Sequence, residues 1–142
     1  MTEFRPWHRR RLLKLARLLN TKKVAAHFNL NNWLTGELKD LVSKKKDCGT
    51  TACAVGWACT IPQFRKAGLR IYNNPIYSDY WPDFKGTLGF AGVCKFFGLS
   101  NDEAMSLFHP QGYSWVKVTP TDVADKIRLL LKEKAKTQSS LV

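Results

Sequence analysis

Apolar side chains recur with the period of a helix in the first part of the chain. Residues 6–19 begin with Pro6, which suits the first position of a helix, and four apolar residues follow at positions i, i+3, i+4 and i+7. These four residues are Leu12, Leu15, Ala16 and Leu19. The pattern predicts an amphipathic helix that packs through its leucines and exposes its arginines to water.

The same period predicts helices further along the chain. Asn29 or Asn31 can cap a second helix, which carries apolar residues on one face and ends at Lys44-Lys45-Lys46. Its apolar face consists of Leu34, Leu38, Leu41 and Val42. Further helices are expected over residues 62–67 before Gly68, over 87–97 before Gly98, over 101–108 after the Ser100–Glu103 capping box, and after Thr119 and Pro120.

Residues 69–78 show a different pattern, in which apolar and polar side chains alternate. Alternation around Asn73-Asn74 predicts a small β-hairpin, with Pro75 on an edge strand. An aromatic-rich loop is expected to follow, up to Gly86. Aromatic residues at this density either fill the core or form a stacking surface for a planar ligand. They are Tyr72, Tyr77, Tyr80, Trp81 and Phe84.

Residues 47–60 are mostly small and apolar, and they hold three of the four cysteines. Gly49 permits a sharp turn, and Thr50 or Thr51 can cap a helix. The residues that follow, up to Cys59, are apolar on every side, which is typical of a helix buried in a core. We therefore expect a turn, a cap and a central helix. Within it, Gly56 allows another backbone or a flat ligand to come close.

Taken together, these elements predict a mainly α fold. We expect a compact bundle of about five to six helices around a buried central helix at about residues 51–60, with a small β-hairpin near residues 69–78. The chain of 142 residues is long enough to bury one core. Residues 1–136 are predicted to form a single helical domain, and residues 137–142 a frayed C-terminal tail.

Composition places the chain among soluble globular proteins. It is 44% hydrophobic and 12% aromatic, and no apolar run approaches the length of a membrane span or the core of a signal peptide. The four cysteines show no disulfide pattern and are expected to be thiols. We therefore expect a cytoplasmic location, in the host cytoplasm if a phage encodes the protein, and no membrane partner.

The net charge of +12 is unevenly distributed. Residues 1–46 hold 12 Lys and Arg against 3 Asp and Glu, whereas residues 47–142 hold 11 against 8. Such an excess of positive charge attracts anionic ligands and polyanions. The alternative is a protein with a solvated basic face and no anionic partner.

Several segments form a recognisable set. The first are Phe28-Asn29-Leu30 with Trp33, and Cys48-Gly49-Thr50-Thr51-Ala52-Cys53 with Gly56-Trp57-Ala58. The later ones are Phe96-Phe97-Gly98-Leu99-Ser100, Glu103-Ala104, Leu107-Phe108, and Thr119-Pro120 with Val123-Ala124. The set resembles a family of small uncharacterised proteins that is common in phage and bacterial genomes. The resemblance covers most of residues 28–131 and implies a similar architecture in a phage or bacterial cytoplasmic setting. It implies no particular activity.

The sequence favours binding over catalysis. The cysteines lack a Cys-x-x-Cys pair and the histidines lack zinc-finger spacing, so we expect neither metal nor cofactor. Cys48 and Cys53 lie near a helix start, where a thiol pKa is lowered, and His27 or His109 could act as a base. The alternative is that these cysteines are small core residues. Paired carboxylates, a phosphate-binding loop and a nucleophile elbow are lacking, so we expect no catalytic residues.

The leading hypothesis is the binding of a small phosphorylated, nucleotide-type ligand. The turn at Gly49 leads into a predicted helix N-terminus, where free N–H groups and the helix dipole favour phosphate, and aromatic side chains can stack on a base. By analogy with other small phage proteins, the ligand could be a nucleotide signal of host antiviral defence, held by a monomer or at the subunit contacts of a homo-oligomer. The candidate residues are Trp33, Gly49, Thr50, Thr51, Trp57, Arg65, Tyr72, Tyr77 and Trp81.

Two alternatives use the basic N-terminal helix instead. In the first, the helix docks on the backbone of a nucleic acid through Arg9, Arg10, Lys14 and Arg17, with an affinity that falls steeply with salt. In the second, the same face inhibits an acidic host protein.

Overall fold

The computed structural model describes residues 3–42, 50–76, 79–114 and 117–140. Within these residues the chain is 58% helical and 15% strand, and the strands form two small antiparallel sheets. In chain order the elements are α1 (Pro6–Leu19), α2 (Lys22–Ala26), β1 (Leu34–Thr35), α3 (Leu38–Val42), β2 (Thr51–Ala52), α4 (Ala54–Ala58), α5 (Pro62–Lys66), β3 (Leu69–Asn74), β4 (Asp79–Phe84), β5 (Thr87–Leu88), α6 (Gly89–Phe97), α7 (Asn101–Phe108), the 3₁₀ turn η1 (Pro110–Gly112) and α8 (Pro120–Ser140). The prediction of a mainly helical bundle was wrong, because the fold mixes helices with sheets.

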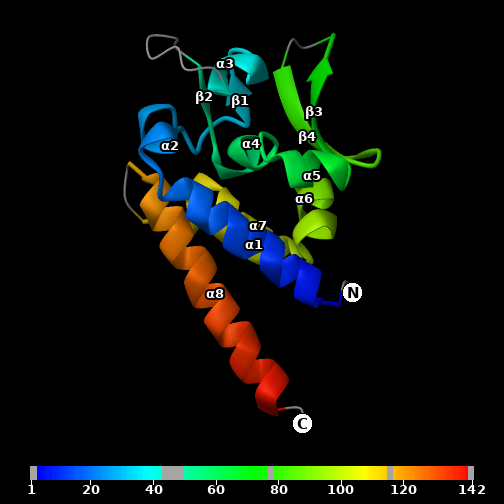
Figure 1. Cartoon of the computed structure of the whole chain (residues 1–142), viewed down its shortest axis with the longest axis vertical. Helices are drawn as coiled ribbons and strands as arrows, with labels where there is room; N and C mark the ends of the chain where they lie inside the picture. Colours follow the sequence, from blue (N-terminus) through cyan, green and yellow to red (C-terminus); the bar gives the residue numbers. More distant parts are fainter. Residues whose placement is uncertain (1–2, 43–49, 77–78, 115–116, 141–142) are drawn as a thin grey trace.

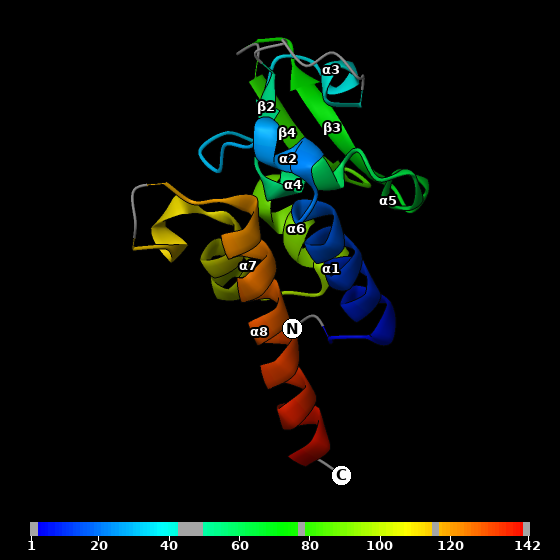
Figure 2. The same cartoon turned by 60° about the vertical axis from the view of Figure 1, so that its left-hand side comes forward.

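The elements are arranged around α4. The two sheets lie at one end of the molecule, α1, α7 and α8 lie at the other, and α4 lies between them (Figures 1 and 2). α1 and α8 pack side by side, and the C-terminal part of α8 extends beyond the rest of the molecule (Figure 2). The predicted apolar face of α1 is buried, as is a stripe on α8. The stripe consists of Val123, Ala124, Ile127 and Leu131.

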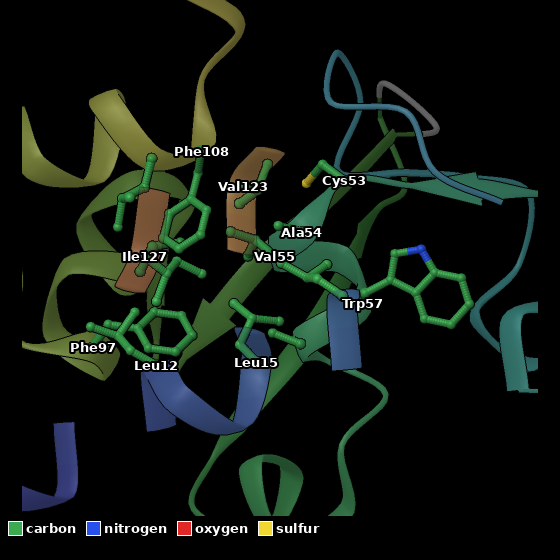
Figure 3. Close-up of a cluster of buried hydrophobic side chains, with 14 of the residues drawn as sticks. Leu12, Leu15, Cys53, Ala54, Val55, Trp57, Phe97, Phe108, Val123 and Ile127 are labelled. Carbon is green, nitrogen blue, oxygen red and sulfur yellow. The ribbon is translucent and has the colours of Figure 1, made fainter. Parts of the chain in front are cut away.

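α4 is the buried central helix, but it is shorter than predicted. All of its residues are buried. Ala54 and Val55 face Leu15 of α1 and Val123 of α8, whereas Trp57 extends from the other side of the helix (Figure 3). The expected first turn is strand instead, because the backbone N–H of Ala52 donates to the carbonyl of His27 at 3.1 Å and its carbonyl accepts from Asn29 at 3.0 Å. This pairing over a long sequence distance outweighs the local helical preference.

The second predicted helix is also interrupted. Leu34 and Thr35 form β1, which pairs with β2, and only residues from Leu38 to Val42 are helical. Gly36 has a φ of +99°, which separates the strand from the helix because this backbone conformation favours glycine. α2 lies between α1 and the start of this segment. The predicted end of the helix at Lys44-Lys45-Lys46 lies outside the described residues.

The predicted β-hairpin is confirmed in type and start, but it is longer. β3 pairs with β4 along its whole length, so the segment expected to be an aromatic loop is a strand, and the turn follows Asn74. The register puts Tyr80 and Phe84 on the face that carries buried Leu69, and Phe84 meets Phe96 of α6 at 5.2 Å between ring centroids. Tyr72 and Trp81 are opposite each other on the other face and are 42% and 40% exposed.

Most predicted helix ends are confirmed, since they depend on local chemistry. Gly98 ends α6 with a φ of +68°. Ser100 and Glu103 form the capping box of α7, with bonds of 3.1 and 2.9 Å. Thr119 caps α8 by accepting from the N–H of Asp122 at 3.2 Å. α8 itself continues through Ser140.

Candidate functional site

The most distinctive segment of the sequence forms a buried cluster with the loop before β1. We define the motif cluster as Ala52, Cys53, Gly56 and Trp57 together with residues 27–34. Trp57 is 1% exposed and its Nε1–H donates to the carbonyl of His27 at 3.0 Å. The N–H of Cys53 donates to the carbonyl of Asn32 at 2.9 Å. The two parts of the sequence that suggested a family are therefore joined by backbone contacts.

Gly56 is needed for this contact. A Cβ at position 56 would lie 2.0 Å from the carbonyl oxygen of Trp33 and 2.7 Å from the Cβ of Ala52. The close approach expected at this glycine is therefore made by the backbone of Trp33 and not by a flat ligand.

The threonines of the predicted phosphate site do not precede a helix. Thr51 belongs to β2, and Thr50 is 4% exposed with its carbonyl oxygen 3.0 Å from Nδ1 of His27. Cys53, and not a threonine, precedes α4, and its side chain makes no capping hydrogen bond to that helix. The backbone amides of Ala52 and Cys53 donate to the carbonyls of His27 and Asn32 and so are engaged within the cluster. Gly49 lies outside the described residues.

The described cysteines are free thiols with little tendency to ionise. Burial raises the pKa of Cys53 to about 11 and raises the pKa of Cys59 further, while both are at most 1% exposed. Cys53 lines a pocket that also contains His109, but a thiol with a raised pKa is a poor nucleophile. Among the residues that the structure describes, no three His, Cys, Asp or Glu side chains come together as a metal site would require.

Trp33 belongs to an aromatic pocket of about 440 Å³. Its ring lies 4.8 Å from that of Phe90, which in turn lies 6.0 Å from His109. The N–H of Gln111 donates to Nδ1 of His109 at 3.1 Å, which leaves Nε2 of a neutral ring as a donor. The other lining residues that the structure describes are Leu30, Asn31, Cys53, Phe108 and Pro110, and none of them is Lys, Arg, Asp or Glu.

The remaining predicted ligand residues do not join Trp33 in the aromatic pocket. Trp57 belongs to the motif cluster, as Trp33 does, but it is not among the described residues that line this pocket, and Tyr72 and Trp81 are on the exposed face of the hairpin. Arg65 is exposed on α5. Tyr77 lies outside the described residues. The described candidates are therefore spread over separate places and do not make a single site.

Some cations of α1 are bonded to neighbouring elements, and others are exposed. Nη1 of Arg9 donates to the carbonyl of Leu131 in α8 at 3.1 Å. Nη1 of Arg11 donates to the carbonyl of Phe96 at 2.7 Å, and the guanidinium lies 4.2 Å from the centroid of that ring. Burial lowers the pKa of Arg11. Both arginines thus fix α1 to its neighbours, and Arg9 differs in this from the other predicted nucleic-acid residues.

The exposed cations are Arg10, Lys14 and Arg17, which we call the basic face. They are at i, i+4 and i+7 on one side of α1. Among the described residues, no carboxylate comes within ion-pair distance of any of them. Residues 4–36 and 48–78 contain no Asp or Glu at all, so α1 itself and α5, which lies across the groove beside it, bring no compensating charge.

A basic groove of about 330 Å³ lies beside the basic face, between α1 and α5. Trp7 lines it and is 46% exposed, which is unusual for so large an apolar side chain. The other lining residues are Arg10, Arg11, Lys14, Gln63, Phe64 and Ala67. Our sequence analysis missed Trp7, although its position at three residues before Arg10 and seven before Lys14 puts it on the same side of the helix.

Comparison with known proteins assigns neither a family nor a function to the chain. The chain matches no protein-family model, no curated protein and no solved structure at a significant level. The resemblance to a phage and bacterial family therefore stays a prediction. Among the described helices, none combines the length and the apolar character that crossing a membrane requires.

Proposed function

We propose that the protein binds nucleic acid through the basic face of α1. The observation that carries this proposal is the group of exposed cations Arg10, Lys14 and Arg17 on a helix without acidic residues. Cations that serve the fold are normally paired or bonded to the chain, as Arg9 and Arg11 are here. Cations left exposed without a carboxylate nearby repel one another, and a polyanion relieves this repulsion.

The dimensions of the face suit a phosphate backbone. A helix rises about 1.5 Å per residue, so Arg10 and Arg17 are about 10 Å apart along the axis of α1. Phosphates of one duplex strand recur every 3.4 Å along the helix axis, so the three cations extend over roughly three nucleotides. Each phosphate contact releases a condensed counterion, which makes the affinity depend on salt.

The experiment compares charge reversal on two helices. The test variant is Arg10→Glu, Lys14→Glu and Arg17→Glu. The control is Arg128→Glu, Lys132→Glu and Lys136→Glu on α8, which removes the same charge from a face where exposed Asp125 and Glu133 are interleaved with the cations. Affinity for a fluorescent 20-nucleotide probe is measured by anisotropy at several salt concentrations.

We expect the α1 variant to lose at least tenfold in affinity and most of its salt dependence, because about three phosphate contacts disappear. The α8 control should bind within a few-fold of the parent. Equal losses in both variants would show that only net charge matters, and binding that is insensitive to salt would contradict the proposal. If polyglutamate displaces the probe more effectively than an unlabelled oligonucleotide, the partner is an acidic protein instead.

The aromatic pocket supports a second candidate function, the binding of a planar base, which is one part of the nucleotide hypothesis. Three adjoining rings and the Nε2–H of His109 can hold a planar ring that carries an acceptor. Because none of the described residues that line the pocket is Lys, Arg, Asp or Glu, it favours a neutral base over a phosphate group. Calorimetric titration with nucleobases, nucleosides and linear and cyclic nucleotides tests this candidate. Heat of binding that is abolished by Trp33→Ala would support it, and absence of heat with the parent protein would reject it.

A further inference from the structure

We propose that the nucleic acid is single stranded and that an unpaired base stacks on Trp7 in the basic groove. This inference rests on the proposed function and specifies its substrate. It uses an observation independent of the charges, namely a tryptophan that remains 46% exposed among cations on the surface of α1.

The geometry of α1 places a stacking ring next to phosphate-binding groups. Trp7, Arg10, Lys14 and Arg17 fall at i, i+3, i+7 and i+10, which keeps them on one side of the helix. A base against the indole therefore has its neighbouring phosphates next to Arg10 and Lys14. Alternation of aromatic and basic groups is the usual arrangement in proteins that bind single strands, because every base has a face that can stack.

The groove itself is suited to a base. Its floor includes Phe64, which is 3% exposed and provides an apolar surface behind the ligand. Gln63 of α5 is exposed on the other wall, and its amide group can both donate to and accept from the edge of a base. Among the described residues, no Asp or Glu lines the groove, and the acidic residue closest to Trp7 in the sequence, Glu3, is paired with Arg5 at 2.7 Å.

Single strands suit this groove better than duplexes. In a duplex the faces of the bases are stacked on one another and cannot reach an indole without unstacking, which costs energy. α5 lies next to the exposed side of α1, and the two helices line the groove together. A flexible strand can enter between them, whereas a duplex can only lie across the outside.

The test uses Trp7→Ala, with Trp81→Ala as the matched control. Trp81 is exposed to a similar extent, at 40%, but it lies on the hairpin and away from the basic groove. A conservative variant, Trp7→Phe, keeps a ring for stacking. The probes are a 12-nucleotide DNA, an RNA of the same sequence, the corresponding DNA duplex and an abasic DNA strand of equal length. Circular dichroism verifies that each variant is folded.

We expect the parent to bind single strands about tenfold more tightly than the duplex. Trp7→Ala should lose about tenfold on single strands and little on the duplex or the abasic strand, while Trp7→Phe should retain most of the affinity. Trp81→Ala should bind like the parent. The relative affinities for DNA and RNA then show which of the two is the preferred single strand.

Three results would overturn the inference: tighter binding of the duplex, no effect of Trp7→Ala on single strands, or an equal loss on the abasic strand. Each of these leaves the proposed function intact if charge reversal of the basic face still abolishes salt-dependent binding. If the parent binds none of the probes, the proposed function fails, and the inference with it.

Discussion

The motif cluster and the basic face differ in almost every respect. The motif cluster has an unusual sequence, is buried over residues 52–57, and uses its polar groups for hydrogen bonds to the chain, such as the bond from Trp57 to His27. The basic face has an ordinary sequence of leucines and arginines, is exposed, and has no ion-pair partner among the described residues.

This difference separates two sources of sequence signal. In the motif cluster each residue is constrained by several neighbours, so the spacing of glycine, cysteine and tryptophan is specific. On the basic face only charge and helical position matter, so many sequences would serve equally well. A distinctive motif can therefore mark residues that are constrained by tight packing, while the sequence of the surface proposed to bind a ligand is only weakly constrained.

The largest effect on stability is expected for Gly56→Ala. The new Cβ would overlap the carbonyl oxygen of Trp33, which belongs to the backbone and cannot move alone. We expect a loss of about 3 kcal/mol in the free energy of unfolding, which outweighs the gain of about 1 kcal/mol in helix propensity. Urea denaturation followed by circular dichroism measures the free energy of unfolding.

Gly86→Ala is the control for this prediction. Its φ is +92°, but no atom lies within 4 Å of the position of a Cβ. It should lose only about 1 kcal/mol from backbone strain. A Gly56→Ala variant as stable as the control would mean that the motif cluster is loosely packed. Loss of nucleic-acid binding in folded Gly56→Ala would remove the distinction between the two regions.

A smaller effect is expected for Trp57→Phe. The substitution leaves the carbonyl of His27 without its indole donor and creates a cavity where a fully buried ring was. We expect a loss of about 2 kcal/mol in the free energy of unfolding, measured by the same method. Trp81→Phe on the exposed hairpin face should change it by less than about 0.5 kcal/mol. Similar losses in both would contradict a special role for the buried indole.

The smallest effect concerns pH and the inner side of α1. His8 is 6% exposed, and its Nδ1 accepts from the N–H of Arg5 at 3.0 Å. Burial, together with the charges of Arg11 and Arg5, lowers its pKa in the folded protein. The unfolded state therefore binds a proton more readily, so the contribution of His8 to stability is present above its unfolded pKa of about 6.5 and is lost as pH falls through the folded pKa.

We expect the urea midpoint to decrease between pH 7.5 and pH 5, and to decrease less in His8→Gln. The difference between the two proteins isolates His8 from the other histidines. An identical decrease in both would show that His8 does not contribute to the pH dependence. Because His8 is on a different side of α1 from Arg10, Lys14 and Arg17, salt-dependent binding of duplex DNA by His8→Gln should match that of the parent.

The fold was predictable where local chemistry decides it. Pro6, Gly98 and the capping residues Ser100 and Thr119 mark helix ends that the structure confirms. Thr51 and Leu34 could not be assigned in this way. Their strands are two residues long and exist because distant backbone groups pair. Such pairing leaves no periodic pattern in so short a segment.

The candidate site was predictable only in part. The helical spacing of Arg10, Lys14 and Arg17 is visible in the sequence, whereas the attachment of Arg9 to α8 and of Arg11 to Phe96 depends on partners more than 80 residues away. The predicted ligand residues were grouped by their chemistry, but in the structure Trp33 lines the aromatic pocket, Trp57 is buried in the motif cluster, and Trp81 lies on the hairpin.

The sequence by itself determined the amphipathic helices, the hairpin and the excess of positive charge at the N-terminal end, since these follow from composition and from residues close together in the chain. The tertiary structure decided which cations are free, which aromatic residues are exposed, and that the glycine and cysteines of the motif serve packing. Those properties depend on contacts between segments far apart in the sequence, and only the folded chain brings these segments together.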